Sequence, residues 1–335
     1  MAGPGDTMSI LIEAEKLKKY FEFRPSPFSI AKKSVRAVDG VTLSIHHKET
    51  LGLVGESGCG KTTLGRLFLR LIGPTAGTVR FMGHDISRLK KREARRLRSE
   101  MQIIFQDPFA SLNPRKTVRQ ILSKLSLYHR VVSKEEIEGY ISELLEMVGL
   151  TPTKLYLDRY PHEFSGGQRQ RIGIARAIAI RPKFIVADEP VASLDMSVRA
   201  QILNLMKHLQ KEFGITYLFI THDLAVIRSM ADSVAIMYLG KIVEHAKVEE
   251  FYRNPTHPYS QAIISATPIP NPELQRGRKQ LMLRGDPPSP IDIPSGCRFH
   301  TRCEYCQPKC IKIEPELAEV SNDHLVACHL SERVG

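Results

Sequence analysis

A glycine-rich run directly after an apolar run is the clearest sign of chemistry in this chain. The apolar run 51–54 reads as a short buried strand and leads into Gly55-Glu56-Ser57-Gly58-Cys59-Gly60-Lys61-Thr62-Thr63, after which a helical face begins at Leu64. Glycines let a backbone curl closely around phosphate oxygens, and the N–H groups of a helix N-terminus face negative charge. Lys61 would reach the β- and γ-phosphates, and the Thr62 hydroxyl would bind Mg²⁺. The pattern predicts a nucleoside triphosphatase without saying of which kind.

Two acidic residues end a second apolar run. Phe184 to Ala187 is typical of a buried parallel strand, and it leads into Asp188 and Glu189. Asp188 is placed to hold Mg²⁺, directly or through water, while Glu189 can orient or deprotonate the water that attacks the γ-phosphate. The run Ile215 to Ile220 leads likewise to His222, whose imidazole N–H could contact the γ-phosphate. A histidine after a strand is more often structural, but its place downstream of two carboxylates favours the catalytic interpretation.

The elements that must hold these residues alternate along the chain. Short β-type runs and glycines fill the first hundred residues, a helical region follows to about Leu150, and buried-strand runs then alternate with helical stretches to about Ala246. In the helical region Ser133 and Glu136 have capping-box spacing ahead of an apolar helical stripe from Ile137 to Val148. This alternation predicts an α/β core.

The amino-acid composition limits the classes of protein to which the chain can belong. The chain has 335 residues, 42% of them hydrophobic and 25% charged, which is typical of a globular protein with one large core and a smaller appendage. No apolar stretch approaches the roughly 18 residues of a membrane-spanning helix, and no secretory signal precedes the first strand, so we expect a cytoplasmic protein. The net charge of +12 suits nucleic acid, an anionic membrane surface or a phosphate ligand without choosing among them. The densest basic run, 88–98, is interpreted as a solvated helical face.

A second glycine-rich helix start is the most specific motif. Phe164-Ser165-Gly166-Gly167-Gln168 precedes a helical run, and its N–H groups can also bind phosphate. One chain rarely needs two such cradles for one nucleotide. With these motifs the sequence resembles the ABC ATPase family, whose signature is usually LSGGQ, and Phe164 replaces the leucine at a position where bulk matters more than chemistry. The resemblance implies a head-to-tail dimer in which ATP lies between the phosphate loop of one subunit and the signature of the other.

The same resemblance gives roles to residues whose own pattern is weak. Gln106, by itself a turn residue, is similar to the family's Q-loop glutamine, which couples the Mg²⁺ site to the membrane partner. Ser193-Leu194-Asp195 resembles the D-loop that crosses the dimer interface beside the nucleotide, and His222 resembles the switch histidine. For the aromatic residue that stacks on adenine we choose Phe21, with Tyr20 as its competitor, since stacking needs only a π face.

The resemblance covers about residues 10–250 and sets the expected fold. It implies an α/β P-loop NTPase core of ABC type, with a mixed sheet and helices, an antiparallel β subdomain and a helical subdomain at about 107–165. After Asn254 the composition changes abruptly, because residues 255–335 hold 11 of the 21 prolines and five of the six cysteines. We therefore expect an ATPase domain over 1–254 and a small Cys/Pro-rich domain over 255–335.

Cysteines cluster in the C-terminal segment. Cys297, Cys303, Cys310 and Cys328 follow one another as C-x5-C-x6-C-x17-C, with Cys306 among them. A reducing cytoplasm disfavours disulfides, so metal ligation is the better interpretation. Thiolates alone suit an iron–sulfur cluster or structural zinc, three nearby histidines keep mixed zinc ligation open, and free thiols are the remaining alternative. The histidines are His300, His324 and His329.

Two further motifs indicate a subfamily of the ABC ATPases. Asn254-Pro255-Thr256-His257-Pro258-Tyr259 and Gly296-Cys297-Arg298-Phe299-His300 are similar to those of oligopeptide and dipeptide importer ATPases of bacteria and archaea. In that subfamily the four spaced cysteines match positions associated with a 4Fe–4S cluster, and Cys306 is a departure that could substitute for a ligand.

The resemblance implies an ATP- and Mg²⁺-dependent ATPase subunit of a membrane importer, with peptides as the cargo, at the cytoplasmic face of the membrane. Its implied partners are two transmembrane permease subunits, a second ABC ATPase subunit in a homo- or heterodimer, and indirectly an extracytoplasmic solute-binding protein. The alternative is an ABC ATPase that acts on nucleic acid or ribosomes. It is less favoured, and we expect no nucleic-acid partner, because this chain has neither the long coiled coils of repair proteins nor the two ATPase cores of translational ones.

Overall fold

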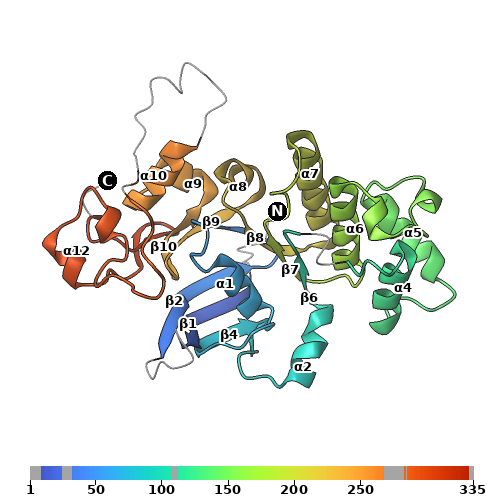
Figure 1. Ribbon diagram of the computed structural model, residues 1–335, viewed down its shortest axis with the longest axis horizontal. Helices are drawn as coiled ribbons and strands as arrows, with labels where there is room; N and C mark the ends of the chain where they lie inside the picture. Colours follow the sequence, from blue (N-terminus) through green and yellow to red (C-terminus); the bar gives the residue numbers. More distant parts are fainter. Residues whose placement is uncertain (1–8, 25–31, 108–111, 268–282, 284, 332–335) are drawn as a thin grey trace, which may run out of the picture. The chain divides into compact units, whose positions relative to one another are not determined.

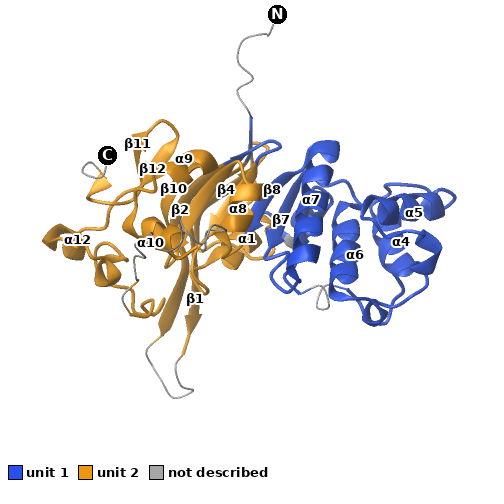
Figure 2. Ribbon diagram, turned by 90° about the horizontal axis from the view of Figure 1, so that it is seen from above, with its two compact units in different colours: residues 1–11, 45–49, 88–220 blue, residues 12–44, 50–87, 221–335 orange. Residues whose placement is uncertain are grey.

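The computed structural model describes residues 9–24, 32–107, 112–267, 283 and 285–331 (Figure 1). Its contacts divide the chain into two compact units, which Figure 2 shows in different colours. Unit 1 comprises residues 1–11, 45–49 and 88–220, and unit 2 comprises residues 12–44, 50–87 and 221–335. Each unit is therefore assembled from stretches that lie far apart in the sequence.

Unit 2 contains nearly all of a four-stranded sheet with the strand order β2-β1-β4-β5. The strands are β1 Ile10–Phe23, β2 Lys33–His46, β4 Ala76–Phe81 and β5 His84–Asp85. β4 pairs in antiparallel fashion with both β1 and β5. Val41, Leu43 and Ile45 of β2 are buried, whereas Thr42 between them is exposed. This two-residue alternation is what a sheet with one face on a core requires.

A second set of strands in unit 2 is mixed. The strands are β3 Thr50–Val54, β9 Ser233–Tyr238, β10 Lys241–Lys247, β11 Ala318–Ser321 and β12 His324–Val326. β3 runs parallel to β9, whereas β9 with β10, β10 with β12, and β12 with β11 are antiparallel. Every residue of β3 and β9 is buried, as expected for central strands. The C-terminal segment thus adds two strands beside β10.

The helices of unit 2 are short. They are α1 Lys61–Phe68, α8 Leu224–Met230, α9 Val248–Arg253, α10 Pro258–Ala266, η4 His300–Arg302 and α12 Pro308–Lys312. Phe299, directly before η4, packs against Tyr238 and Tyr259, with ring centroids 5.4 Å away in both cases. This aromatic contact fastens the cysteine-rich segment to β9 and α10.

Unit 1 contains three parallel strands: β6 Met101–Ile104, β7 Phe184–Asp188 and β8 Thr216–Ile220. Its helices are α2 Lys91–Arg96, η1 Leu97–Ser99, α4 Val118–Tyr128, α5 Ile137–Met147, η2 Thr153–Leu155, η3 Pro161–Glu163, α6 Gly166–Ile178 and α7 Met196–Phe213. Ser133 and Glu136 form reciprocal bonds before α5, since Ser133 N–H donates to the Glu136 carboxylate at 3.0 Å and Glu136 N–H donates to Ser133 Oγ at 3.4 Å. The apolar stripe of α5 is buried, which confirms the helix predicted from its spacing.

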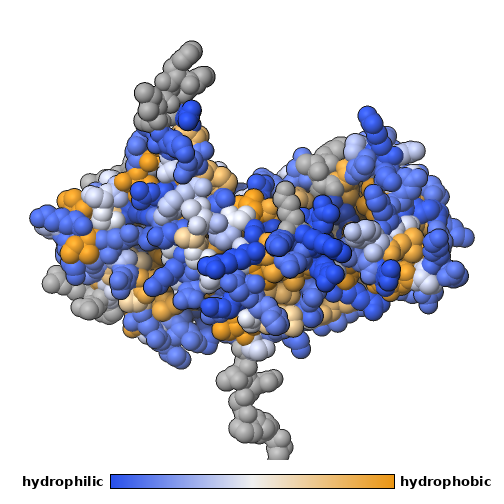
Figure 3. Space-filling view, turned by 90° about the horizontal axis from the view of Figure 1, so that it is seen from below, coloured by the Kyte–Doolittle hydropathy of each residue, from blue (hydrophilic) through white to orange (hydrophobic). Residues whose placement is uncertain are grey.

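The expected α/β class is confirmed, with a mixed sheet, an antiparallel sheet and a group of helices. Within the part of the chain that the structure describes, no helix combines the length and apolarity needed to cross a membrane. The face in Figure 3 is mostly hydrophilic, with apolar side chains in separate small patches.

Candidate functional site

The glycine-rich loop in unit 2 connects β3 to α1 and has the shape that phosphate binding requires. Gly60 precedes α1 with a φ of 112°, in the left-handed region that favours glycine. A Cβ at Gly60 would lie 2.0 Å from the Ala37 carbonyl oxygen, and a Cβ at Gly55 would lie 2.1 Å from that of Met237. Backbone from two other segments therefore packs so closely behind the loop that only glycine fits at these two positions.

Lys61 lies inside the curve of this loop. Its side chain is only 6% exposed, and its ammonium group donates to the carbonyl oxygens of Gly55 at 2.7 Å and Glu56 at 2.9 Å. A nucleotide phosphate would offer this cation a charged partner in place of neutral carbonyls. The buried Cys59 thiol has a pKa raised by burial, so it stays protonated and takes no part as a thiolate.

The structure separates the two candidates for adenine stacking. The Tyr20 hydroxyl donates to the Asp39 carboxylate at 2.5 Å, and burial together with this bond raises the pKa of Tyr20 to about 12. Phe21 is 41% exposed, and the Lys19 ammonium lies over its ring, 5.1 Å from the centroid. The phenylalanine thus offers an accessible ring on the outer part of β1, whereas the tyrosine is tied to its own unit.

In unit 1 the acidic pair ends β7. Asp188 is the last residue of the strand, and Glu189 follows with a φ of 47°, a left-handed conformation that is uncommon for a residue with a side chain. The Glu189 N–H donates to the Ile220 carbonyl at the end of β8, which holds this strained residue in place. Gln106 lies two residues after β6 and is exposed. Since β6 and β7 are parallel, Gln106 and the acidic pair follow strand ends on the same edge.

His222 is exposed and lies in unit 2, two residues after β8. Its neighbour Asp223 caps α8 by accepting from the N–H groups of Ala225 at 2.9 Å and Val226 at 3.4 Å. The exposed histidine thus lies on a turn that the Asp223 cap fixes at the start of α8.

The second glycine-rich run begins helix α6, as its sequence predicts. Ser165 caps α6, with its hydroxyl accepting from Gln168 N–H at 3.3 Å while the Gln168 side chain accepts from Ser165 N–H at 3.1 Å. A Cβ at Gly167 would lie 2.6 Å from Val198 on α7, so the closeness of α7 requires this glycine. Phe164 is buried and stacks on Tyr156, with 6.0 Å between ring centroids, which fits a role in packing. Asp195 is exposed at the start of α7.

The predicted site residues thus divide between the two units. Unit 2 holds the phosphate loop, the candidate aromatic Phe21 and His222, while unit 1 holds Gln106, the pair Asp188 and Glu189, the signature and Asp195.

The cysteine-rich segment brings thiols near one another. Cys310 is buried, Cys306 is exposed and the other three are partly buried. The pKa of Cys297 is raised to about 12, chiefly by burial and to a smaller extent by the neighbouring thiols of Cys328, Cys310 and Cys303. Among the residues that the structure describes, however, no three or more His, Cys, Asp or Glu side chains form a group that could hold a metal ion. The described side chains therefore form no ready metal site, neither for the predicted iron–sulfur cluster nor for zinc as its alternative.

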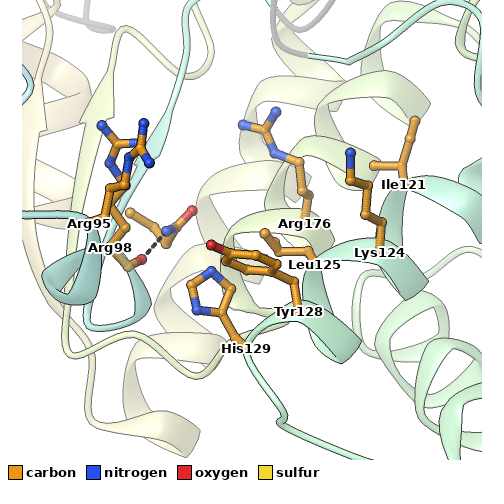
Figure 4. Close-up of a pocket in the computed structure, with 9 residues that line it drawn as sticks. Arg95, Arg98, Ile121, Lys124, Leu125, Tyr128, His129 and Arg176 are labelled. Carbon is orange, nitrogen blue, oxygen red and sulfur yellow. Dashed lines mark hydrogen bonds between the residues drawn. The ribbon is translucent and has the colours of Figure 1, made fainter. Parts of the chain in front are cut away.

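Unit 1 also contains a basic pocket that the sequence analysis missed. It has a volume of about 550 Å³ and is lined by residues from η1, β6, α4, α6 and the end of α2 (Figure 4). The lining residues are Arg95, Arg98, Gln102, Ile121, Lys124, Leu125, Tyr128, His129 and Arg176. Four are cationic and none is acidic, and burial lowers the pKa of both His129 and Arg176. The only sequence signal was the basic run 88–98, which we interpreted as a solvated helical face.

This pocket lies beside the Q-loop candidate. The Arg176 guanidinium sits over the ring of Phe105, 6.0 Å from its centroid, and Phe105 directly precedes Gln106. Tyr128 is 76% exposed at the end of α4, with its ring edge against His129. The pocket therefore combines positive charge with an exposed aromatic side chain and touches the segment that leads to Gln106.

Comparisons with known proteins give relatives for both parts of the chain. A family model described as ABC transporter matches residues 38–192, and one described as oligopeptide/dipeptide transporter, C-terminal region, matches residues 243–310. The chain is 50% identical over 321 residues to the oligopeptide transport ATP-binding protein AppF of Bacillus subtilis (strain 168), across 96% of this chain and 97% of that one. It is 47% identical to the oligopeptide transport ATP-binding protein OppF of Salmonella typhimurium, across 95% of this chain and 96% of the relative.

Among solved structures, the fold is similar to that of the ATP-binding cassette MJ0796 in a dimeric post-hydrolysis state with ADP and Pi. The TM-score is 0.62 at 27% sequence identity, over 71% of this chain and 99% of the other.

Proposed function

The chain belongs to the ABC transporter family and, within it, to the oligopeptide transport ATP-binding proteins. From this membership we propose that it is the ATP-hydrolysing subunit of a membrane importer for peptides. ATP binding closes a dimer of ATPase subunits, closure drives the permease from one facing to the other, and hydrolysis resets it. The alternative of an ATPase acting on nucleic acid or ribosomes finds no support among these relatives.

One observation carries this proposal: a single chain has two glycine-rich helix starts of phosphate-binding type. One is the loop before α1, with Lys61 inside its curve, and the other is the Ser165-capped start of α6. Both present backbone N–H groups at a helix N-terminus. A nucleotide held between two subunits uses one start from each, so the active site is complete only with a second ATPase subunit, identical or different.

Each site residue then has its own role in ATP binding or hydrolysis. Lys61 binds the β- and γ-phosphates, Thr62 and Asp188 hold Mg²⁺, and Glu189 orients or deprotonates the attacking water. The remaining contacts come from single side chains around the nucleotide. Gln106 senses the Mg²⁺ site, His222 contacts the γ-phosphate, Phe21 stacks on adenine, and Asp195 crosses to the partner subunit.

The proposed activity is tested on the purified full chain with radiolabelled ATP. We expect Mg²⁺-dependent binding of ATP, and hydrolysis whose rate per subunit rises with protein concentration because two subunits build each site. A chain that binds no nucleotide, or a rate per subunit independent of concentration in a monomeric sample, would contradict the two-subunit site.

We further propose that the basic pocket of unit 1 receives an acidic segment of a permease subunit, which places the chain at the cytoplasmic face of the membrane. Two features support this assignment. The lining has four cations and no carboxylate, so it is complementary to acidic side chains. Arg176 links the lining to Phe105 and hence to Gln106, the residue that responds to Mg²⁺ and ATP.

Reversing the charge of this pocket should weaken the binding of the chain to the permease. The double substitution Arg98→Glu and Lys124→Glu is expected to weaken permease binding about tenfold or more, because it turns attraction into repulsion. Binding is measured by co-purification and by titration of detergent-solubilised permease. The double substitution Arg92→Glu and Lys134→Glu is the matched control, because it changes the charge by the same amount at exposed residues outside the pocket. Equal weakening by the control, or none by the pocket variant, would remove the pocket from the interface.

For the cysteine-rich segment we propose an iron–sulfur cluster, of 4Fe–4S type, held by Cys297, Cys303, Cys310 and Cys328. The support is the donor set: four thiols, three partly buried and one buried, that lie close enough to raise the pKa of Cys297 together. A cluster holds its ligands farther apart than a single ion does, so it suits thiols that do not converge on one point. When bound, it would cross-link the turns of this segment and offer a one-electron couple.

Anaerobic purification tests the cluster directly. We expect iron and acid-labile sulfide in equal amounts, with a broad visible absorbance that Cys310→Ser abolishes and Cys306→Ser leaves in place, because Cys306 is exposed and outside the ligand set. Zinc in place of iron would support the alternative metal. A segment that stays metal-free after reconstitution would exclude both.

A further inference from the structure

We propose that Arg302 of the cysteine-rich segment is a positioning residue of the phosphate loop, which it holds through Glu56 in the geometry that binds ATP. The inference rests on the proposed function, because it assumes that the loop binds a nucleotide. Arg302 lies far from the loop in sequence, and no catalytic role is assigned to it.

The contact itself is an ion pair between a buried arginine and a partly buried glutamate. The Arg302 side chain is 6% exposed, and its Nη1 donates to both carboxylate oxygens of Glu56, at 3.0 and 2.8 Å. The guanidinium also sits over the ring of Tyr238, 6.0 Å from its centroid. Removing the carboxylate from so well buried a cation is costly, so the pair with Glu56 is held in the folded protein.

Glu56 passes this constraint to the phosphate-binding backbone. Its N–H donates to the Tyr259 hydroxyl at 3.0 Å, and its carbonyl oxygen accepts from Lys61 at 2.9 Å and from Cys59 N–H at 3.3 Å. Glu56 is thus held at its side chain, its N–H and its carbonyl. A shift of its side chain would move the peptide groups that shape the loop and the carbonyl that orients Lys61.

A second contact from the same segment reaches the adenine side of unit 2. Arg298 is buried, and its guanidinium pairs with the Asp39 carboxylate and donates to the Leu239 carbonyl. Asp39 in turn accepts from Tyr20, the neighbour of Phe21 on β1. Cys297 directly precedes Arg298 and Cys303 directly follows Arg302. A cluster or metal ion bound by these two thiols would therefore also fix the positions of both arginines.

Two substitutions separate positioning from simple charge effects. Arg302→Gln removes a positive charge near the phosphates, and Glu56→Gln removes a negative one. If only long-range charge matters, the first substitution weakens ATP binding and the second strengthens it. If the ion pair positions the loop, both weaken binding, and the double variant is little worse than either single one, because the same contact is lost in all three.

The experiment measures the ATP dissociation constant of the full chain by calorimetry with Mg²⁺, and KM and kcat in the assembled complex. We expect each single variant to raise the dissociation constant and KM about tenfold, with kcat changed much less, and Arg302→Lys to recover part of the loss. Lys309→Gln, an exposed cation in the same segment, is the matched control and should match the unsubstituted protein.

Failure of the positioning role and failure of the proposed ATPase function give different results. Tighter ATP binding by Glu56→Gln, or a dissociation constant within twofold of the unsubstituted protein in folded Arg302→Gln, would overturn the positioning role while leaving the proposed ATPase intact. Absence of ATP binding by the unsubstituted chain would refute the proposed function itself. Should Arg302→Gln fail to fold, the Glu56→Gln result decides alone, because that variant keeps the buried arginine and a side chain of the same shape.

Discussion

The variant Glu189→Gln is expected to bind ATP with nearly unchanged affinity and to hydrolyse it about 10²- to 10⁴-fold more slowly. The glutamine keeps the size of the side chain at the end of β7 but cannot take a proton from the attacking water. The phosphate loop lies in unit 2 and is not altered by this substitution. ATP should therefore accumulate in a closed dimer, detectable by gel filtration and by retained radiolabelled nucleotide.

Glu189 has a φ of 47°, so a change in backbone could also lower activity. Glu189→Asp is the control, because it keeps the carboxylate but withdraws it by one methylene, and it should retain more turnover than the glutamine variant. Hydrolysis by Glu189→Gln at close to the normal rate would show that another group orients the water.

The variant Lys61→Ala is expected to fail at an earlier step. Removing the ammonium group takes away the cation that faces the β- and γ-phosphates, and we expect turnover to fall about 10²- to 10³-fold together with a marked loss of ATP affinity. Calorimetry and a single-turnover assay distinguish this result from that of Glu189→Gln, in which binding persists.

Folding is a concern here, since Lys61 also bonds to the carbonyl groups of Gly55 and Glu56. Thermal unfolding of the variant without nucleotide serves as the control and should show a modest loss of stability, because the buried Gly55 carbonyl loses its donor. ATP affinity is therefore compared at a temperature at which the variant is folded. Normal ATP affinity in Lys61→Ala would contradict the assigned role.

Much of the site could be predicted from the sequence because its motifs consist of neighbouring residues. The loop before α1 and the capped start of α6 depend on contiguous residues, so glycine spacing and a serine cap suffice to predict them. The close approaches behind Gly55 and Gly167 show why those positions carry no side chain. The α/β class followed from alternating apolar runs, which the parallel strands β6, β7 and β8 bear out.

Features made by packing between distant residues were not predictable. The basic pocket joins Arg98, Tyr128 and Arg176 from separate elements, and no local spacing indicates that they meet. Arg302 and Glu56 are 246 positions apart. The sequence favours Phe21 over Tyr20 for adenine stacking only weakly, since both offer a π face, and the bond from Tyr20 to Asp39 depends on a residue on another strand.

The coupling of ATP hydrolysis to peptide import by this chain is tested most directly by ATP turnover in the whole complex. The chain is reconstituted in lipid vesicles with its permease subunits, the second ATPase and the binding protein, and turnover is measured with peptides and with solutes of other classes. We predict that short peptides stimulate hydrolysis and enter the vesicles, and that Glu189→Gln abolishes both effects. Stimulation by another solute class and by no peptide would contradict the account.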